Sequence, residues 1–463
     1  FIPFYLFTIT IIIHTKFYMN TPTKYSYKEI WLITYPILVS LIMEQLIGMT
    51  DTAFLGRVGE IELGASALAG VYYMIIFMIA FGFSIGAQIL IGRRNGEGNY
   101  KQIGSIFYQG VVFLLSLAVV MFVLSQLYSP YILKDIIQSN EVFHATVSYI
   151  NWRVYGFFFS FIGVMFRAFF VGTTQTKTLT LNSIVMVLSN VIFNYILIFG
   201  KFGFPALGIA GAAIGSSLAE LVSVIFFIIY TCRKIDFRKY GLNHFSGIQW
   251  GILKRILNVS LWTMIQNFLS MSTWFLFFIA VEHLGERSLA ITNIIRNVSA
   301  IPFMTVIAFA STTSTLISNL IGAGDIQYVR GTLKQTIRMA YYFVAPIIII
   351  FAVFPSLILH IYTNSQELVY ASTPALWVLC SAYLFLVPGN IYFQAVSGTG
   401  NTRSALMLEF TTLIIYVLYV CYMIFYLRID VAWCWTTEHV YGGFIYLFSW
   451  WYMKKGKWQN KRI

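Results

Sequence analysis

The sequence predicts an all-α polytopic membrane protein with twelve transmembrane helices in two parallel six-helix lobes. Composition is the first observation behind this prediction: 59% of the 463 residues are hydrophobic, only 10% are charged, and the mean hydropathy is +0.76. Soluble domains carry about 25% charged residues. Apolar stretches long enough to cross a bilayer recur along the chain, whereas the strands of a membrane β-barrel would be shorter and alternating.

Twelve apolar stretches account for most of the chain. A helix rises 1.5 Å per residue, so about 20 residues cross the roughly 30 Å of hydrocarbon in a bilayer. The last stretch is the shortest. The predicted spans are residues 30–52, 68–91, 104–126, 146–168, 178–199, 209–231, 256–281, 289–319, 336–362, 371–393, 404–427 and 438–453.

The placement of positive charge is the second observation. Lysine and arginine gather before the first span, in the loops after every second span and in the tail, whereas the alternate loops (GEIE, HLGE, TNSQE) are poor in them. Because cytoplasmic loops are enriched in basic residues, both termini are predicted to be cytoplasmic. Topology thus explains the net charge of +13, which does not predict nucleic-acid binding.

An internal repeat is the third observation. At an offset of 226 residues, Gly59 falls on Gly285, and the stretch VGTTQTK at 171–177 falls on SGTGNTR at 397–403. An offset of six spans preserves orientation, so the two halves are parallel. Two such lobes enclose a cleft, and rocking one against the other exposes the cleft to each side of the membrane in turn. This organisation is typical of a transporter.

These observations set the predicted domain boundaries. The expected parts are an N-terminal segment at 1–27, a six-helix lobe at 28–231, a cytoplasmic loop at 232–255, a second lobe at 256–453 and a basic cytoplasmic tail at 454–463. The first apolar run is too short to span and lacks the basic residues of a signal peptide. We expect Met19 to be the start and residues 1–18 to be translated upstream sequence; the alternative is a true additional segment.

Signals for other classes of protein are weak. The sequence holds no HExxH or paired intramembrane aspartate motif, so we expect no enzyme and no cofactor. The four cysteines lack CxxC spacing, which predicts apolar packing rather than a disulfide framework or a metal site. These cysteines are Cys232, Cys380, Cys421 and Cys434.

Three stretches carry a family resemblance: TDTAFLGRVGEIELGASAL in the first span and loop, FRAFFVGTTQTKT before the fifth span, and GIAGAAIGSSLAE in the sixth. From about Lys28 onward the chain resembles the multidrug and toxic compound extrusion (MATE) family, and within it the DinF-like branch. The resemblance implies two six-helix bundles facing each other in a V-shaped cleft. It also implies a monomer in the bacterial inner membrane that exports small amphiphilic, mainly cationic compounds in exchange for Na⁺ or H⁺.

Acidic residues inside the spans are the main candidates for function. An ionised carboxylate in hydrocarbon costs at least about 2.5 kcal/mol, so such groups face a cavity or a partner. The four candidates are Glu44, Asp51, Glu220 and Glu409. The resemblance implies that Asp51 is the family's first-helix aspartate, which takes up a proton or supplies an oxygen ligand to Na⁺. The alternative is a helix-end aspartate at the outer interface.

Three neutral residues would complete this coupling site. Asn190 and Asn194 are four residues apart and share one helical face. The resemblance places them, together with Ser216, at the family's cation-site positions. One carboxylate and three neutral oxygens suit Na⁺, and they also suit a hydrogen-bond network switched by a proton. Alternatively, the two asparagines hold neighbouring helices together.

The expected substrate cavity rests on the same helix. Glu44 lies two turns before Asp51, so the two share a face, and we expect Glu44, Tyr35 and Met43 to line the cavity. A neutral Glu44 hydrogen-bonded between helices is the alternative. Glu220 and Glu409 are expected to be packing or interface residues.

The second lobe departs from the NorM-type branch of the family, which carries acids in the seventh and tenth helices. The aligned positions here are the neutral Ser270 and Leu386, so coupling is predicted in the first lobe only. A flippase for a lipid-linked oligosaccharide is the alternative function. It would need many basic residues in the cleft to bind a pyrophosphate, and few basic residues lie within the spans.

Overall fold

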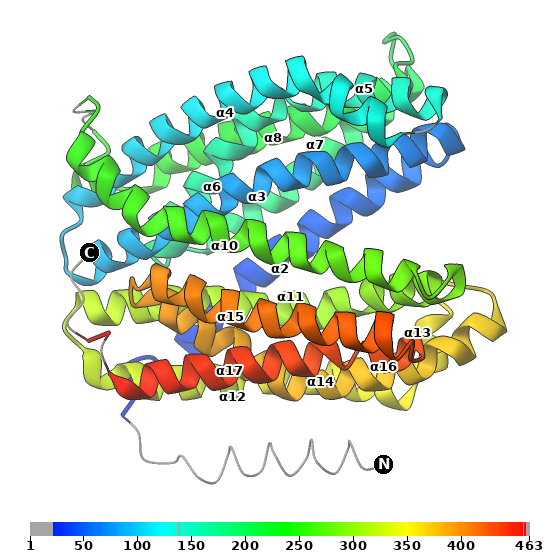
Figure 1. Cartoon of the computed structure of the whole chain (residues 1–463). Helices are drawn as coiled ribbons and strands as arrows, with labels where there is room; N and C mark the ends of the chain where they lie inside the picture. The colour runs from blue at the N-terminus through cyan, green and yellow to red at the C-terminus, as the bar shows by residue number, and fades with distance from the viewer. Residues whose placement is uncertain (1–21, 138, 244, 246, 457, 460–463) are drawn as a thin grey trace. The chain divides into compact units, whose positions relative to one another are not determined.

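The structure, a computed structural model, describes residues 22–137, 139–243, 245, 247–456 and 458–459 (Figure 1). The expectation for Met19 and residues 1–18 lies outside this part. The chain folds as two compact units. Unit 2 is Tyr35–Met264, and unit 1 combines the residues up to Thr34 with Ile265–Ile463. The division falls within two helices, whereas the sequence analysis placed it in the loop 232–255.

The helices of unit 2 follow the predicted apolar stretches, except for the short α9, which lies in the predicted loop. The first helix, α2, belongs to this unit from Tyr35 onward. Its helices are α2 (Tyr27–Leu55), α3 (Glu60–Gly96), α4 (Lys101–Ile136), α5 (Asn140–Arg153), α6 (Gly156–Gly172), α7 (Lys177–Phe199), α8 (Gly208–Lys234), the short α9 (Phe237–Tyr240) and the first half of α10 (Trp250–Glu282).

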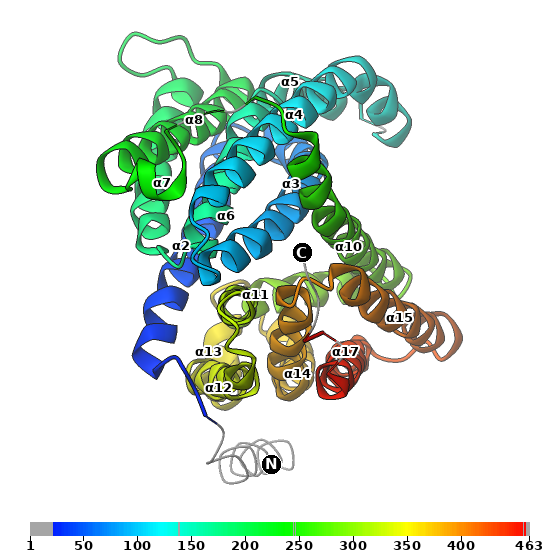
Figure 2. The same cartoon turned by 90° about the vertical axis from the view of Figure 1, so that its left-hand side faces the viewer.

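Unit 1 contains the rest of α10 and the helices that follow it. Figure 2 looks nearly along the axes of α12, α14 and α17, which run side by side in this bundle. Its further elements are α11 (Glu286–Gly322), the 3₁₀ turn η1 (Ile326–Tyr328), α12 (Val329–Val353), α13 (Pro355–Leu359), α14 (Gln366–Gly398), α15 (Thr402–Cys421), the π-helical turn η2 (Tyr422–Tyr426), α16 (Val431–Cys434) and α17 (Thr437–Lys455).

All twelve predicted spans fall on helices, but fewer meet a strict test of length and apolarity. Within the described ranges, ten helices are long and apolar enough to cross a membrane. The fourth predicted span is the pair α5 and α6, bent by 52°, and counting it as one span makes eleven. The twelfth, α17, begins next to Glu438 and ends in Lys454 and Lys455, so it is shorter and more polar than the others.

The internal repeat is visible in the helix bounds. Helix α11 begins and ends 226 residues after α3, and α14 spans the same interval after the α5–α6 pair. The two halves therefore repeat one pattern of helices, with a break in the first half where the second half has a continuous helix. Arg153 and Gly156 flank that break.

Small residues bring α7 and α8 into close contact. Helix α8 starts with GIAGAAIGSSLAE, in which glycine, alanine or serine recurs every fourth residue, a pattern that lets helix backbones approach in membranes. At Gly215 an added Cβ would collide with the Oδ1 atom of Asn194 in α7. This glycine therefore fixes the distance between the two helices.

We expect Gly215→Val to destabilise the protein by about 1–3 kcal/mol, because the added side chain overpacks the α7–α8 contact. Thermal unfolding of the purified protein in detergent measures the effect as a lower midpoint. The matched control is Gly70→Val in α3, where an added Cβ meets no atom within 4 Å. Equal midpoints for the two variants would contradict the packing argument.

Candidate functional site

Asp51, near the end of α2, accepts hydrogen bonds from two other helices. Asn194 of α7 donates from Nδ2 to Asp51 Oδ1 over 2.5 Å, and Ser216 of α8 donates from Oγ to Oδ2 over 3.1 Å. Both donors are buried, and Asp51 is half-buried. Each carboxylate oxygen thus has its own donor.

Asn190 closes this network into a ring. Its Nδ2 donates to Ser216 Oγ over 3.1 Å, and its Oδ1 accepts from Asn194 Nδ2 over 3.3 Å. The four predicted coupling residues Asp51, Asn190, Asn194 and Ser216 therefore lie together. Their role in ion coupling stays a prediction.

The chemistry of the ring fits a proton or a monovalent cation. An ionised carboxylate only accepts hydrogen bonds, and the donors directed at Asp51 suit that form. The buried Oδ1 of Asn194 has no hydrogen-bond partner within the described residues, so a further neutral oxygen is available beside the carboxylate. Across the described ranges no three His, Cys, Asp or Glu side chains gather as a metal site. Asp51 with its neutral oxygens suits H⁺ or Na⁺ rather than a divalent transition metal.

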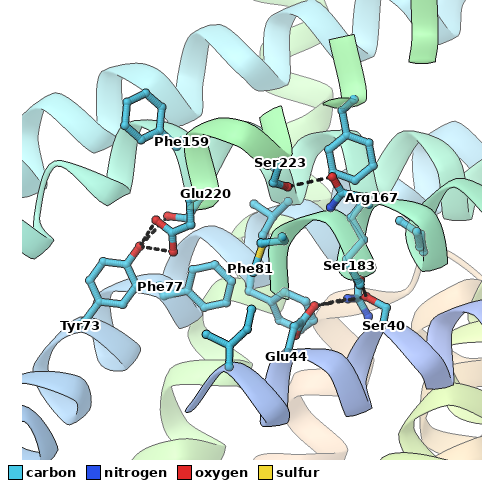
Figure 3. A pocket seen from close by; sticks show the side chains of 18 of the residues that line it. Ser40, Glu44, Tyr73, Phe77, Phe81, Phe159, Arg167, Ser183, Glu220 and Ser223 are labelled. Carbon is cyan, nitrogen blue, oxygen red and sulfur yellow. Dashed lines mark hydrogen bonds and ion pairs between the residues drawn. The ribbon is translucent and has the colours of Figure 1, made fainter. Parts of the chain in front are cut away.

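A cavity within unit 2 lies between α2, α3, α5, α6, α7 and α8 (Figure 3). One wall carries a chain of polar groups around Glu44. Ser183 donates to Ser40 over 3.1 Å, Ser40 donates to Glu44 Oε1 over 3.3 Å, and Arg167 Nη1 donates to the same oxygen over 3.2 Å. The Glu44 side chain is 48% exposed and that of Arg167 is 12% exposed. Glu44 is therefore the more accessible member of this ion pair.

A second ion pair lines another part of the same cavity. Arg153 of α5 binds Glu220 of α8 with two parallel hydrogen bonds of 2.9 Å and 2.6 Å. The Tyr73 hydroxyl lies 3.1 Å from Glu220 Oε1, and the Arg153 guanidinium lies over the Tyr73 ring at 3.7 Å from its centroid. Gly156 makes room for this pair, since a Cβ there would collide with both charged groups. Paired geometry of this kind offsets the cost of burying two charges.

The rest of the lining mixes aromatic, aliphatic and small polar side chains. The aromatic members are Tyr73, Phe77, Phe81, Phe159 and Phe227, which line the same cavity as the two ion pairs. Flat apolar rings next to charged groups provide a binding surface for amphiphilic molecules, and they favour cations by about 0.5–2 kcal/mol per ring contact. The cavity thus combines apolar area with charges of both signs.

Three helices, α2, α7 and α8, carry both residues of the Asp51 ring and residues that line the cavity; on α7 these are Asn190 and Asn194 in the ring and Ser183 in the lining. Asp51 itself is not among the residues that line the cavity, whereas Glu44, two turns earlier on α2, is. On α8, Ser216 donates a hydrogen bond to Asp51. Glu220, one turn later on the same helix, lies in the cavity wall. A change at Asp51 that moves α2 or α8 therefore reaches the cavity. Tyr35 and Met43 do not line this cavity, so their assignment to the substrate site stays a prediction.

The pairing of Arg153 with Glu220 was missed in the sequence analysis. Glu220 was expected to be a packing or interface residue, but it forms an ion pair with the half-buried Arg153 in the cavity wall. The available signal was the presence of opposite charges in two predicted spans, since charges within a membrane usually pair. The sequence did not indicate that α5 and α8 are neighbours.

Comparisons with known proteins agree with the predicted fold. The chain is 25% identical over 388 residues to a probable multidrug resistance protein NorM of Thermotoga maritima, covering 83% of each chain. It is 24% identical over 393 residues to the probable multidrug resistance protein YoeA of Bacillus subtilis, covering 82% of this chain and 83% of the relative.

Solved structures show the same architecture. An outward-facing multidrug resistance MATE family transporter matches with a TM-score of 0.85 at 16% identity, over 94% of this chain and 97% of that chain. A MOP superfamily transporter from Pyrococcus furiosus, described as having a binding pocket of reverse polarity, matches with a TM-score of 0.83 at 16% identity over the same shares. These matches confirm the predicted helical membrane fold.

The family model named MatE matches the chain twice, at residues 36–196 and 263–423, which agrees with the internal repeat. The two matches together cover more than half of the chain. The chain therefore belongs to the MatE family of multidrug and toxic compound extrusion transporters.

Proposed function

We propose that this protein is a secondary antiporter that exports amphiphilic, mainly cationic compounds in exchange for H⁺ or Na⁺, with Asp51 as the ion-binding group. The observation that supports this most directly is the ring of hydrogen bonds around Asp51, in which neutral side chains bind a carboxylate inside a predicted span. The names of the multidrug resistance relatives support the choice of substrate class.

Binding of a proton would rearrange this ring in a defined way. The Asn194 amide nitrogen can only donate, so Oδ1 of Asp51 has to remain an acceptor. The proton would therefore sit on Oδ2 and be donated to Ser216, whose own hydroxyl proton must turn to another acceptor. Na⁺ would instead need the amide and hydroxyl oxygens turned toward it. In either case the contacts that join α2, α7 and α8 change.

This rearrangement couples the ion to the substrate in our proposal. Helices α2 and α8 carry both the ion ligands and the cavity residues Glu44 and Glu220. Uptake of the ion shifts these helices and alters the cavity, so the substrate is released; loss of the ion to the cytoplasm restores the cavity. The protein would work as a monomer in the bacterial inner membrane with both termini cytoplasmic, and without enzymatic activity or a cofactor.

The charges of the cavity favour zwitterionic substrates in addition to cations. Glu44 is the accessible acid, and its partner Arg167 is bound through a single hydrogen bond of 3.2 Å. A ligand with an amine and a carboxylate could place the amine on Glu44 and the carboxylate on Arg167. The flippase alternative is less well supported, because the family match and the aromatic lining favour export of small amphiphiles.

The first test uses Asp51→Asn in liposomes loaded with ethidium. We expect an imposed H⁺ or Na⁺ gradient to drive ethidium efflux in the unchanged protein. We expect the variant to fall to the background of ethidium-loaded liposomes without protein, because an amide cannot take up a proton and supplies no negative charge to hold Na⁺. The ion whose gradient drives efflux identifies the coupling ion.

The matched control is Asp135→Asn, at an exposed position near the end of α4. It should transport at the unchanged rate. Full efflux by Asp51→Asn would remove Asp51 from the mechanism and turn attention to Glu44. If the unchanged, folded protein shows no gradient-driven efflux, this result counts against drug export and favours the flippase alternative.

A second test addresses substrate charge with Arg167→Gln. We expect the variant to lose about tenfold or more in apparent affinity for rhodamine B, whose carboxylate is free, because a hydrogen bond to a charged group contributes about 1.5–3 kcal/mol. Affinity for the ethyl ester of the same dye, a cation without a carboxylate, should remain within about threefold. Equal losses for both dyes would contradict a carboxylate-binding role for Arg167.

A further inference from the structure

The internal repeat places a polar cluster at equivalent positions in the two halves. In unit 2 the cluster is Ser40 and Glu44 on α2 with Ser183 on α7, joined by hydrogen bonds. At the repeat offset of 226 residues, these three positions become Gln266 and Ser270 on α10 and Glu409 on α15. The acid has therefore moved from the first helix of one half to the fifth helix of the other.

The cluster in unit 1 joins the same two helix positions as its counterpart. Ser270 Oγ is hydrogen-bonded to Glu409 Oε1, the Tyr441 hydroxyl of α17 lies 3.4 Å from the same oxygen, and the Gln266 side chain lies next to the carboxyl group. Glu409 is 2% exposed, and its second oxygen, Oε2, has no hydrogen-bond partner in the described part of the chain. Both hydroxyl contacts of this buried carboxyl group thus fall on one oxygen.

The Glu409 carboxyl group lies among uncharged neighbours. Within the described residues no ion pair reaches Glu409, in contrast to Glu44 and Glu220. Helix α10 supplies uncharged groups to the cluster, and α17 supplies Tyr441, which also lies near Glu438 of its own helix. In α14, which packs against α15, the only charged residue is Glu367, exposed in its first turn. A bare, ionised carboxylate in such surroundings is costly.

The protons of the cluster can be counted. The Ser270 hydroxyl lies 2.9 Å from the backbone oxygen of Gln266, which can only accept. A serine hydroxyl has a single proton. If Ser270 gives this proton to Gln266, its contact with Glu409 requires the carboxyl group to be the donor, and therefore to be protonated. In that form Oε2 is a neutral carbonyl oxygen, whose lack of a partner costs far less than that of a charged oxygen.

No carboxylate or amide stands at the unit 1 positions equivalent to Asp51, Asn190 and Asn194. The position equivalent to Asp51 is Phe277, and the position equivalent to Asn190 is Tyr416, whose ring centroid lies 6.5 Å from that of Phe277. Aromatic packing thus replaces the ring of hydrogen bonds. Any ion site of unit 1 has to lie elsewhere, and Glu409 is a buried acid that shares its site with side chains from two further helices.

We propose that Glu409 is a second proton-binding site, located in unit 1 and independent of Asp51, in which Ser270 accepts a hydrogen bond from the protonated carboxyl group. The step is simple proton exchange: the O–H bond forms at Oε1 when a proton enters from water and breaks when the proton returns to water. The site rests on the proposed function and extends it, because it allows the transport cycle to move a proton in addition to the ion at Asp51.

The test is a pH-difference infrared spectrum of the purified protein, which records protonated carboxyl groups directly and does not depend on transport. We expect a carboxyl C=O band that decreases as the pH is raised between about 5 and 9, within the range over which buried acids titrate. Glu409→Gln should remove this band, whereas Asp51→Asn should leave it unchanged. Ser270→Ala should keep the band and shift it to higher frequency, since the carboxyl group loses its hydrogen-bond acceptor.

Glu367→Gln is the matched control, because this exposed acid pairs with Arg287 on the surface and should leave the band in place. Glu409→Gln must retain the thermal unfolding midpoint of the unchanged protein to within a few degrees; if it does not fold, the Ser270→Ala shift decides. The proposal is overturned if Glu409→Gln leaves the spectrum unchanged, if Ser270→Ala produces no shift, or if the band does not respond to pH. None of these outcomes depends on the efflux result for Asp51→Asn.

Discussion

The arrangement of the helices depends on the hydrogen-bond donors and ion-pair partners that each acid within the predicted spans requires. An ionised carboxylate without a partner is costly in hydrocarbon. Four of these acids are compensated in four different ways. Asp51 has neutral donors on both oxygens, Glu44 has Ser40 and a singly bonded arginine, and Glu220 has a bidentate arginine. Glu409 has hydroxyl contacts and, among the described residues, no ion pair. These differences separate groups that can exchange an ion from a group that is locked in a salt bridge.

Close packing of α7 and α8 allows neutral side chains to compensate the Asp51 carboxylate. Neutral donors compensate a carboxylate only when they are held at hydrogen-bond distance, and the absence of a side chain at Gly215 allows Asn194 and Ser216 to reach Asp51 together. Such a site is rigid in its parts but sensitive to the charge at its centre. A change from acceptor to donor at one oxygen of Asp51 conflicts with the donation from Ser216, and the conflict is resolved only if helices move or hydroxyls turn.

Much of this arrangement could be predicted from the sequence, for reasons that differ between its parts. Hydropathy located the helices because burial in lipid is a local property, but it did not reveal that α3 extends from Glu60 to Gly96, since helices continue beyond the hydrocarbon. The spacing of Asn190 and Asn194, together with the family resemblance, predicted neighbours of Asp51. The bond between Arg153 and Glu220 could not be predicted, because it depends on which helices are adjacent and on the break before Gly156.

The comparison of the two halves explains why similar helices serve different purposes. A repeat preserves helix positions, but side chains at equivalent positions can exchange roles as long as the polar groups of each cluster keep hydrogen-bond partners. Ser183 reaches Glu44 through Ser40, whereas Ser270 at the Glu44 position bonds Glu409 at the Ser183 position directly. In unit 2 the acid lies in a cavity next to an arginine and is exposed to ligands; in unit 1 it is buried among uncharged groups. In our proposals the same pair of positions therefore serves substrate binding in one half and proton binding in the other.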